Sequence, residues 1–322
     1  MELTDASILV TGGTGSFGTR FVETVLARHR PRRLAVFSRD ELKQSEMQAR
    51  FKHPALRFFI GDVRDRERLL RAMHDVDVVV HAAALKQIPA CEYNPFEAIQ
   101  TNVMGAKNVI DAAIDSGVKR VIALSSDKAV NPLNLYGATK LCAEKLFVQA
   151  NTYGFARGTT FACVRYGNVI GSRGSVIPLF QAQRANGSVS VTDPKMTRFW
   201  ITLQQGVDFV ARCLGQMRGG EIFVPKLPST RILDLVEAVA PGCRVDFVGI
   251  RPGEKLHEVL ISEDEARQAR ELDDMFVVEP LSPSWGYRPW TEGRRLAAGA
   301  SYASDTNGHF LAPAEMRSLV DG

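Results

Sequence analysis

A tyrosine and a lysine near the middle of the chain have the types and spacing for acid–base chemistry. Tyr136 and Lys140 are four residues apart, and on a helix this spacing places both side chains on one face. A lysine ammonium beside a phenol favours the phenolate, so the tyrosine can act as a base near neutral pH. Ser126 lies upstream and could hydrogen-bond the reacting hydroxyl, which completes a Ser-Tyr-Lys set. An exposed pair without a catalytic role has the same spacing, so the surrounding elements are needed to decide.

Directly after Ser126 the chain carries an acid followed by a base, Asp127 and Lys128. Oxidation of an alcohol by Tyr136 and Lys140 does not require this pair. It is either a partly exposed salt bridge or part of an additional chemical step.

The elements that must position these residues alternate regularly in the first half of the chain. Short apolar segments predict strands at 7–10, 34–37, 56–60, 76–80 and 120–124. Apolar residues at helical spacing predict helices at 17–28, 41–51, 65–74 and 96–116, the last with a start at Asn94-Pro95. This alternation predicts an α/β fold, a Rossmann-type doubly wound parallel sheet buried on both faces. Tyr136 and Lys140 then follow the fifth strand, which favours the catalytic interpretation.

The regular alternation of predicted strands and helices ends after Arg165, where glycines and prolines become frequent. We expect residues 1–165 to form the nucleotide-binding domain, with a helix within 199–216 returning to it. Residues 166–281 are expected to form a smaller substrate-binding lobe. Residues 282–322 are expected to be a C-terminal tail with little regular structure.

The first predicted strand ends in a glycine-rich turn, Thr11 to Gly18. Gly12, Gly15 and Gly18 allow a tight turn, close approach of a pyrophosphate and close packing of helix on strand. The next helix offers free N–H groups to the phosphate. The expected cofactor contacts in this turn are Gly12, Thr14, Gly15, Ser16, Phe17 and Gly18.

The end of the second strand bears on the choice of cofactor. Ser38, Arg39 and Lys43 could form a cradle for a 2′-phosphate, which favours NADP. Asp40 leaves NAD open, because its carboxylate could bind a ribose hydroxyl or simply cap the next helix. Asp62 and Val63, after the third strand, are placed to hold the adenine edge, or they are an ordinary polar strand end.

Composition narrows the class of protein. The chain has 322 residues, 45% hydrophobic and 24% charged, with a net charge of +4, and no dense basic tract indicates nucleic-acid binding. Five cysteines and six histidines are dispersed, which predicts free thiols, a reducing cytoplasm and no metal site. No apolar run is long enough to cross a membrane, so no membrane partner is expected.

Several motifs together resemble the extended short-chain dehydrogenase/reductase family over about the first 280 residues. They are His81 to Lys86, Ser125 to Pro132, Arg165 to Val169, Met196 to Trp200 and Arg251 to Glu258. Within that family they are similar to the soluble, inverting UDP-N-acetylglucosamine 4,6-dehydratases of the pseudaminic acid pathway type. The resemblance implies a hydro-lyase that uses NADP, with Ala82 and Ala83 near the cofactor, and a homo-oligomer.

The resemblance gives the acid–base pair a task. After oxidation at C4 of the sugar by Tyr136, Lys128 would remove the C5 proton and Asp127 would protonate the departing O6. Lys128 must then be neutral, which requires its pKa to be lowered by desolvation or by cations such as Lys140. Asp127 must be protonated, which requires a raised pKa. An ion pair between the two residues would oppose both shifts.

The resemblance also implies the substrate contacts. Ser126 and Tyr136 would bind the sugar, Lys86 would face the active site, and Asn168 would contact the phosphates. Arg198 and Arg251 are candidate diphosphate clamps, because guanidinium binds phosphate in bidentate fashion, and Glu254 could hold the ribose. Each charged residue among them could instead belong to an interdomain or surface ion pair.

Two other functions remain open. A UDP-hexose 4-epimerase shares the fold, the cofactor turn and the Tyr-Lys pair, but it needs no acid and base for C5 and C6. A non-enzymatic NADP-sensing regulator shares the fold but usually lacks the tyrosine and the lysine. Asp127 and Lys128 favour the dehydratase over the epimerase, and Tyr136 and Lys140 disfavour the sensor.

Overall fold

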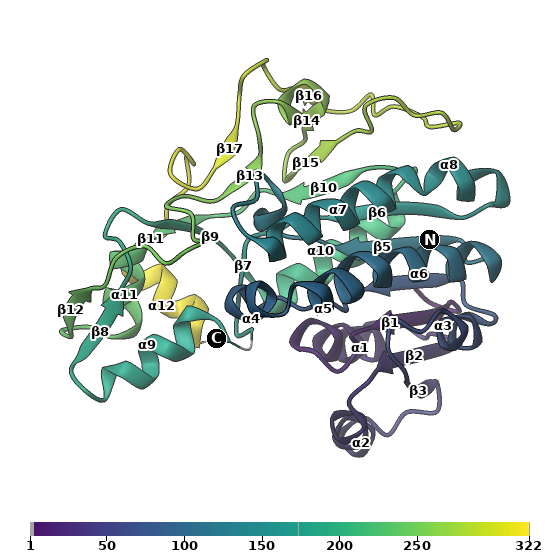
Figure 1. The fold of residues 1–322 in the computed structure, drawn as a ribbon, viewed down its shortest axis with the longest axis horizontal. Helices are drawn as coiled ribbons and strands as arrows, with labels where there is room; N and C mark the ends of the chain where they lie inside the picture. The colour runs from purple at the N-terminus through teal and green to yellow at the C-terminus, as the bar shows by residue number, and fades with distance from the viewer. Residues whose placement is uncertain (1–2, 173, 322) are drawn as a thin grey trace.

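The computed structural model describes residues 3–172 and 174–321. Its centre is a mixed β-sheet whose strand order in the described residues is β16-β14-β15-β10-β6-β5-β4-β1-β2-β3 (Figure 1). The parallel strands are β1 (Ser7–Thr11), β2 (Arg33–Ser38), β3 (Leu56–Ile60), β4 (Val78–His81), β5 (Arg120–Leu124), β6 (Thr160–Val164) and β10 (Ile222–Pro225). β15 (Met275–Val278), β14 (Ala269–Glu271) and β16 (Arg294–Arg295) continue the sheet in antiparallel fashion.

The central parallel strands are buried on both faces, as the sequence predicts, whereas the edge strand β3 is only partly buried. Every residue of β1 and β4 is buried, which requires helices on each side of the sheet. The helices connecting these strands are α1 (Ser16–Arg28), α2 (Glu41–Arg50), α3 (Arg66–Met73), α4 (Ile88–Tyr93), α5 (Pro95–Ile99), α6 (Gly105–Asp115), α7 (Leu135–Gln149) and α8 (Asn151–Gly154). The short elements between them are the π-helix η1 (Gln100–Met104) and the 3-10 helices η2 (Asp127–Ala129) and η3 (Phe155–Arg157). The Rossmann-type fold is therefore confirmed.

The order in which successive strands are added to the sheet reverses at β1. The chain runs from β1 through β2 to β3 at one edge, and then returns to place β4 on the other side of β1. A crevice forms at the carboxyl ends of the strands at such a switch point, and doubly wound sheets bind their ligands there. The turn after β1 and the loop after β4 both open into this crevice.

A second group of elements lies to the left of the main sheet in Figure 1. It comprises β7 (Asn168–Ile170), β8 (Ser188–Val191), β9 (Thr197–Thr202), β11 (Ser229–Arg231), β12 (Arg244–Phe247), α9 (Val176–Arg184), α11 (Ile232–Val239) and α12 (Pro313–Asp321). These elements enclose a second hydrophobic core that includes Phe180, Trp200, Leu235 and Met316. The helix α10 (Leu203–Gln216) lies against α1 instead, where Arg28 binds Asp208 over 2.9 Å.

The last forty residues contain more regular structure than the sequence predicts. β16 pairs with β14, β17 (Tyr302–Ala303) pairs with β13 (Val259–Ile261), and α12 packs against α11. The expectation of little regular structure beyond Ser282 is therefore wrong. These elements are short, and a short helix such as α12 is stabilised mainly by the burial of side chains such as Met316 rather than by local propensity.

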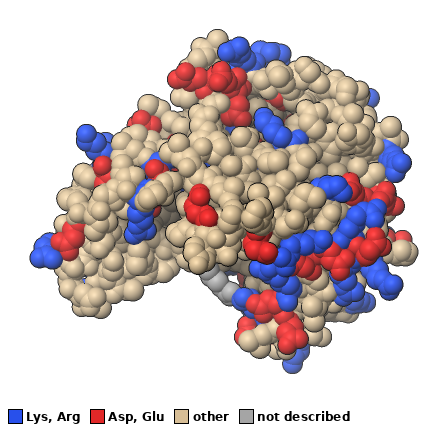
Figure 2. All heavy atoms as spheres, in the orientation of Figure 1, with Lys and Arg blue, Asp and Glu red and all other residues tan. Residues whose placement is uncertain are grey.

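Charges of both signs are interspersed on the face shown in Figure 2. Many form neighbouring pairs on the helices of the first half, such as Arg66 with Asp115 and Lys107 with Asp111. Among the described residues, no helix has the length and apolar character to span a membrane.

Candidate functional site

The turn after β1 has the shape that a pyrophosphate requires. Gly12 has a φ of +65°, and a Cβ there would lie 2.8 Å from the backbone of Ala83. Gly15 precedes the first residue of α1, Ser16, and no side chain caps the N-terminus of that helix. The N-terminus of α1, with its positive dipole end, therefore lies at the turn after β1, where it suits an anion. Gly18 lies directly against Gly13, which allows α1 to pack closely on the turn. The Phe17 ring stacks on Phe21, one turn further along the same helix.

The loop after β4 closes the same turn from the other side. Ala82 N donates to Thr11 O over 3.1 Å, and Ala83 N lies 3.4 Å from Thr11 Oγ1. The predicted cofactor residues of the two loops are thus adjacent in space. This glycine cradle fits a dinucleotide.

The predicted 2′-phosphate cradle lies at the end of β2. Ser38 Oγ is 2.7 Å from Thr14 Oγ1, which joins the cradle to the glycine turn. The Asp40 carboxylate accepts from Lys43 N over 3.0 Å as the N-cap of α2, and Lys43 Nζ also binds it. Arg39 is well exposed and lies 3.6 Å from Asp62. The capping interpretation of Asp40 is therefore the one that the structure displays.

The predicted adenine-edge residues, Asp62 and Val63, follow β3. Asp62 accepts from Arg64 N over 3.0 Å and from the Arg64 guanidinium over 2.8 Å. Burial would raise the pKa of Asp62, but the hydrogen bonds and charge of Arg64, with the charge of Arg39, lower it overall. Val63 is buried, and its carbonyl accepts from Asn108 Nδ2 over 3.1 Å.

The helix α7, which carries Tyr136 and Lys140, is held at its N-terminus by Asn134. Asn134 Oδ1 accepts from Gly137 N over 2.8 Å as the N-cap. Gly137 itself packs on the backbone of η2: a Cβ at this position would lie 2.3 Å from Lys128 O. A glycine is therefore required where the helix that carries Tyr136 contacts the segment that carries Lys128.

Tyr136 and Lys140 share the buried face of α7, as their spacing predicts. Burial raises the pKa of Tyr136 to about 12, although the charge of Lys128 and a hydrogen bond with Ser126 act in the opposite direction. Lys140 Nζ donates to Leu124 O over 2.5 Å. Burial lowers the pKa of Lys140, partly offset by the nearby Glu144 and Cys163. Ser126, Tyr136 and Lys140 thus lie together at the end of β5.

Asp127 and Lys128 form an ion pair. Lys128 Nζ lies 3.0 Å from Asp127 Oδ1, and Ser126 Oγ donates to the same oxygen over 2.7 Å. Asp127 is completely buried, and the Lys128 side chain keeps 24% of its surface exposed. Burial alone would lower the pKa of Lys128, but the charges of Asp127 and Glu258 raise it overall. The expected lowering of this pKa is therefore wrong for the free protein, because the two carboxylates outweigh desolvation.

Behind Lys140 lies a buried polar network. Arg165, at 0% exposure, binds Glu144 over 2.6 Å and Glu265 over 2.9 Å. Ser125 also donates to Glu144, which follows Lys140 by one helical turn. His81 at the end of β4 lies 2.8 Å from Thr11 Oγ1, and burial, with the charge of Lys140, lowers its pKa to about 3.

Lys86 lies in the loop that a π-helix holds in place. Asn102, within η1, donates to Leu85 O over 2.9 Å and accepts from Leu85 N over 2.8 Å. Lys86 is exposed, yet partial burial and the charge of Lys128 lower its pKa. Lys86 therefore lies within reach of the charge of Lys128.

The other predicted substrate residues divide into two sets. Asn168 Oδ1 accepts from Lys128 Nζ over 3.3 Å, so it lies at the acid–base pair. Arg198 donates to the carbonyls of Thr197, Lys255 and Leu256 over 2.7 to 3.0 Å and keeps 14% of its side chain exposed.

Arg251 and Glu254 lie 3.8 Å apart, and the Arg251 side chain is 57% exposed. Their loop is tied to the catalytic helix, because Asn134 Nδ2 donates to Gly253 O over 2.8 Å. These residues are brought to one region, but Arg198 supports the 255–256 backbone whereas Arg251 is open to solvent.

Four residues with clear positions in the site were not singled out from the sequence: Asn102, Asn134, Lys255 and Glu258. Asn134 precedes the helix that carries Tyr136, a recognisable N-cap signal. Lys255 and Glu258 lie in the motif from Arg251 to Glu258. Their positions depend on contacts with residues far away in the sequence, such as that of Glu258 with Lys128. Asn102 depends on a π-helix, which apolar periodicity does not reveal.

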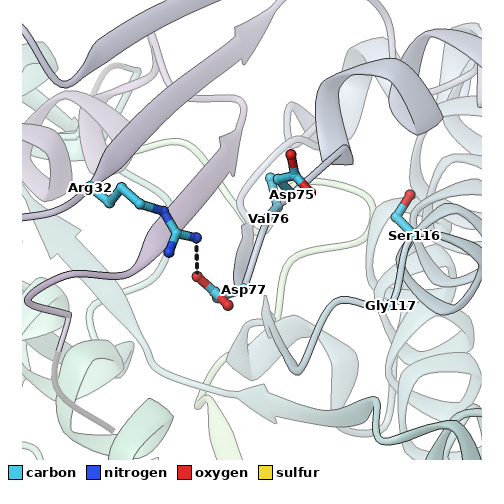
Figure 3. A pocket seen from close by; sticks show the side chains of 6 residues that line it. All are labelled: Arg32, Asp75, Val76, Asp77, Ser116 and Gly117. Carbon is cyan, nitrogen blue, oxygen red and sulfur yellow. Dashed lines mark hydrogen bonds and ion pairs between the residues drawn. The ribbon is translucent and has the colours of Figure 1, made fainter.

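A separate hollow opens at the opposite end of the sheet (Figure 3). Arg32, Asp75, Val76, Asp77, Ser116 and Gly117 line it. Asp77 binds Arg32 over 3.0 Å and Lys119 over 2.9 Å. The hollow lies where β4 and β5 begin, so it shares no residue with the catalytic set.

Comparison with known proteins agrees with this geometry. Residues 8–280 match the model of the polysaccharide biosynthesis protein family. The chain is 48% identical to the UDP-N-acetylglucosamine 4,6-dehydratase (inverting) of Campylobacter jejuni subsp. jejuni serotype O:2, over 98% of this chain and 97% of the relative. It is also 43% identical to a UDP-glucose 4-epimerase of Rickettsia canadensis, over 98% and 95% of the two chains.

Among solved structures, the chain is similar to that of Pen from Bacillus thuringiensis. The TM-score is 0.91 at 40% identity, with 99% of this chain and 98% of the other covered. The chain therefore belongs to the polysaccharide biosynthesis protein family, within the extended short-chain dehydrogenase/reductases.

Proposed function

We propose that this protein is a C5-inverting UDP-N-acetylglucosamine 4,6-dehydratase that uses NADP. Its products would be UDP-2-acetamido-2,6-dideoxy-β-L-arabino-hex-4-ulose and water, as in the first step of pseudaminic acid-type pathways. The observation that carries the proposal is the contact between Asp127 and Lys128, 3.0 Å apart, beside the buried Tyr136. The 48% identity to the Campylobacter dehydratase, over nearly the full length of both chains, supports it.

The cofactor would lie on the glycine turn and the loop after β4. Ser38, Arg39 and Lys43 would hold a 2′-phosphate, since Asp40 already caps α2. Asp62 and Val63 would hold the adenine, and Ala82 and Ala83 would line the cofactor. The chemistry that a bound nicotinamide would supply here is transfer of a hydride from C4 of the sugar and its later return to C6.

Tyr136 removes the proton from the C4 hydroxyl, and Ser126 holds that hydroxyl. Tyr136 is protonated in the free protein, because burial raises its pKa to about 12. The Lys140 ammonium favours the phenolate through its charge. Oxidation to the ketone acidifies the C5 hydrogen, which prepares the elimination.

The acid–base pair then performs the loss of water. One proton that moves from Lys128 Nζ to Asp127 Oδ1 converts the ion pair into a neutral amine and a neutral acid. A bound sugar excludes water from Lys128, and desolvation disfavours the two charges. Lys128 takes the C5 proton, Asp127 gives its proton to O6, and the C6–O6 bond breaks with release of water. The Lys128 ammonium can return a proton to the opposite face of C5, which inverts that centre.

The nucleotide end of the substrate would lie toward the loop that carries Arg251 and Glu254. Arg251 is the more available diphosphate clamp, since its side chain is 57% exposed. Arg198 and Asn168 would support the loop and Lys128 in addition to any phosphate contact. We also propose a homo-oligomer in the cytoplasm, which light scattering and cell fractionation would test.

Incubation of the purified protein with UDP-N-acetylglucosamine tests the function. The expected product has lost one water by mass and shows the 4-keto absorbance. Proton NMR of the product in deuterated water should show a single inverted, deuterated C5.

The alternative is a UDP-hexose 4-epimerase, which the Rickettsia relative favours. An isobaric product would establish the epimerase and overturn the dehydratase. Bound NADP without turnover would instead indicate a sensing role.

A further inference from the structure

A buried carboxylate to which the proposed mechanism gives no role lies against Lys128. Glu258 keeps only 4% of its side chain exposed, and its Oε1 lies 3.5 Å from Lys128 Nζ. The same oxygen is 3.8 Å from Arg198 Nε, and Lys255 Nζ lies 4.0 Å from Oε2. Among the described residues, Oε2 has no hydrogen-bond partner. A charged carboxylate is costly to bury, and only these cations offset its loss of water.

The backbone of Glu258 is fixed by the C-terminal segment. Glu258 N donates to Ser304 Oγ over 2.9 Å, and Ser304 N donates to Glu258 O over 2.8 Å. Ser304 is completely buried, and its Oγ is 2.7 Å from Thr197 Oγ1. These two contacts fix the main chain of Glu258, and with it the point from which its side chain reaches Lys128.

We propose that Glu258 is a positioning residue: anchored by Ser304, it is the second counter-ion that holds Lys128 Nζ and keeps one proton on the Asp127–Lys128 pair. This role rests on the proposed function of Lys128 as the C5 base. The pair can perform the elimination only with one proton, because Asp127 must give a proton to O6 after Lys128 takes one from C5.

The charges that face Lys128 determine the sign of the effect. Asp127 and Glu258 favour the Lys128 ammonium, whereas Arg198, Lys255 and Lys86 oppose it. Tyr136 also feels the charge of Lys128. His257, next to Glu258 in the chain, lies 2.9 Å from Thr197 Oγ1. Removal of the Glu258 charge should therefore lower the pKa of Lys128, and the pair should lose its proton at a lower pH.

The experiment measures Lys128 directly. Wild type and Glu258→Gln are labelled with trace acetic anhydride across a pH series, and mass spectrometry quantifies acetylation of the Lys128 peptide, since only the neutral amine reacts. The midpoint should shift down by about one pH unit in Glu258→Gln. The basic limb of the kcat/KM profile for dehydration should shift in the same direction. Glu258→Asp, which keeps the charge, should restore most of the wild-type midpoint.

Glu263→Gln is the matched control, because it removes the same charge from an exposed position five residues away. Its midpoint should equal that of wild type. If Glu258→Gln does not fold, Ser304→Ala keeps the carboxylate but removes the Oγ that accepts from Glu258 N, which loosens the backbone of Glu258. A smaller shift in the same direction is then expected.

The possible outcomes test the role of Glu258 and the proposed dehydratase function independently. An unchanged midpoint in folded Glu258→Gln, with normal dehydration by wild type, would overturn the role of Glu258. A shifted midpoint in a protein that dehydrates no sugar would overturn the proposed function and leave Glu258 as the counter-ion of Lys128.

Discussion

Asn134 donates a hydrogen bond to the carbonyl oxygen of Gly253 over 2.8 Å, while its own side-chain oxygen caps α7. One side chain thus joins the catalytic helix to the loop that carries Arg251 and Glu254. The position of Tyr136 and the position of the loop proposed to bind the nucleotide are therefore linked.

Two substitutions distinguish the effect of the hydrogen bond to Gly253 from the effect of the helix cap. Asn134→Asp keeps the capping oxygen but removes the donor to Gly253, so stability should be retained while KM rises by roughly two- to tenfold. Asn134→Ala removes both, and should also lose about 1 kcal/mol of unfolding free energy. Steady-state kinetics and urea unfolding measure the two effects. Equal KM values for Asn134→Asp and wild type would show that the loop does not depend on this bond.

Loss of either member of the acid–base pair should arrest the reaction after oxidation. Lys128→Ala and Asp127→Asn should lower the rate of water loss by about 10²- to 10⁴-fold. Tyr136 and Lys140 remain in place, so reduced cofactor should accumulate on the enzyme and absorb near-ultraviolet light. Tyr136→Phe is the control, because it should block oxidation itself. Normal dehydration by Lys128→Ala would remove Lys128 from the role of base.

Because α7 lies very close to η2 at Gly137, the addition of a single methyl group there should disturb both elements. In Gly137→Ala the new Cβ would lie 2.3 Å from Lys128 O, so Tyr136 and Lys128 must move apart. We expect a loss of about 1 to 3 kcal/mol of stability and at least a tenfold loss of kcat. Gly206→Ala in α10 is the control, since its Cβ would meet only Ile201 at 3.9 Å. That variant should be as stable as wild type or slightly more stable. Equal stability and equal kcat of Gly137→Ala and Gly206→Ala would contradict the close packing of α7 on η2.

The buried His81 should make the protein sensitive to acid. Burial lowers the pKa of His81 to about 3, whereas an unfolded histidine titrates near 6.5. Between these values the unfolded chain binds a proton that the native protein does not. Stability is therefore complete above about pH 6.5 and is lost as the pH falls, by about 2 kcal/mol at pH 5. Urea unfolding at several pH values should show a shallower acid dependence in His81→Gln. The same slope in both proteins would mean that His81 is protonated without cost in the native state.

Arg165 should be among the more sensitive positions for stability. Arg165→Met leaves Glu144 and Glu265 buried without their cation, which should cost about 3 to 5 kcal/mol. Arg267→Met is the control, because its pair with Asp264 spans 3.5 Å between well-exposed side chains. Urea midpoints should differ strongly for the first variant and hardly at all for the second. A small effect at Arg165 would show that the two carboxyls become protonated or hydrated easily.

The sequence predicted those parts of the molecule whose structure depends on residues close together in the chain. The strands of the parallel sheet, the glycine turn and the shared face of Tyr136 and Lys140 follow from spacing alone. The ionisation of Lys128 does not, because Glu258 reaches it from a distant part of the chain. The same limit applies to Asn102, whose position depends on a π-helix, and to α12, whose burial against α11 depends on tertiary packing.

The contact between Glu258 and Ser304 also bears on the order of events during synthesis. The glycine turn and the segment from Ser126 to Lys140 leave the ribosome early, and their strands can pair with one another at once. The backbone partners of Glu258 do not exist until Ser304, near the end of the chain, has been translated. A nascent chain could therefore form the glycine turn and the segment from Ser126 to Lys140 before Glu258 is held beside Lys128.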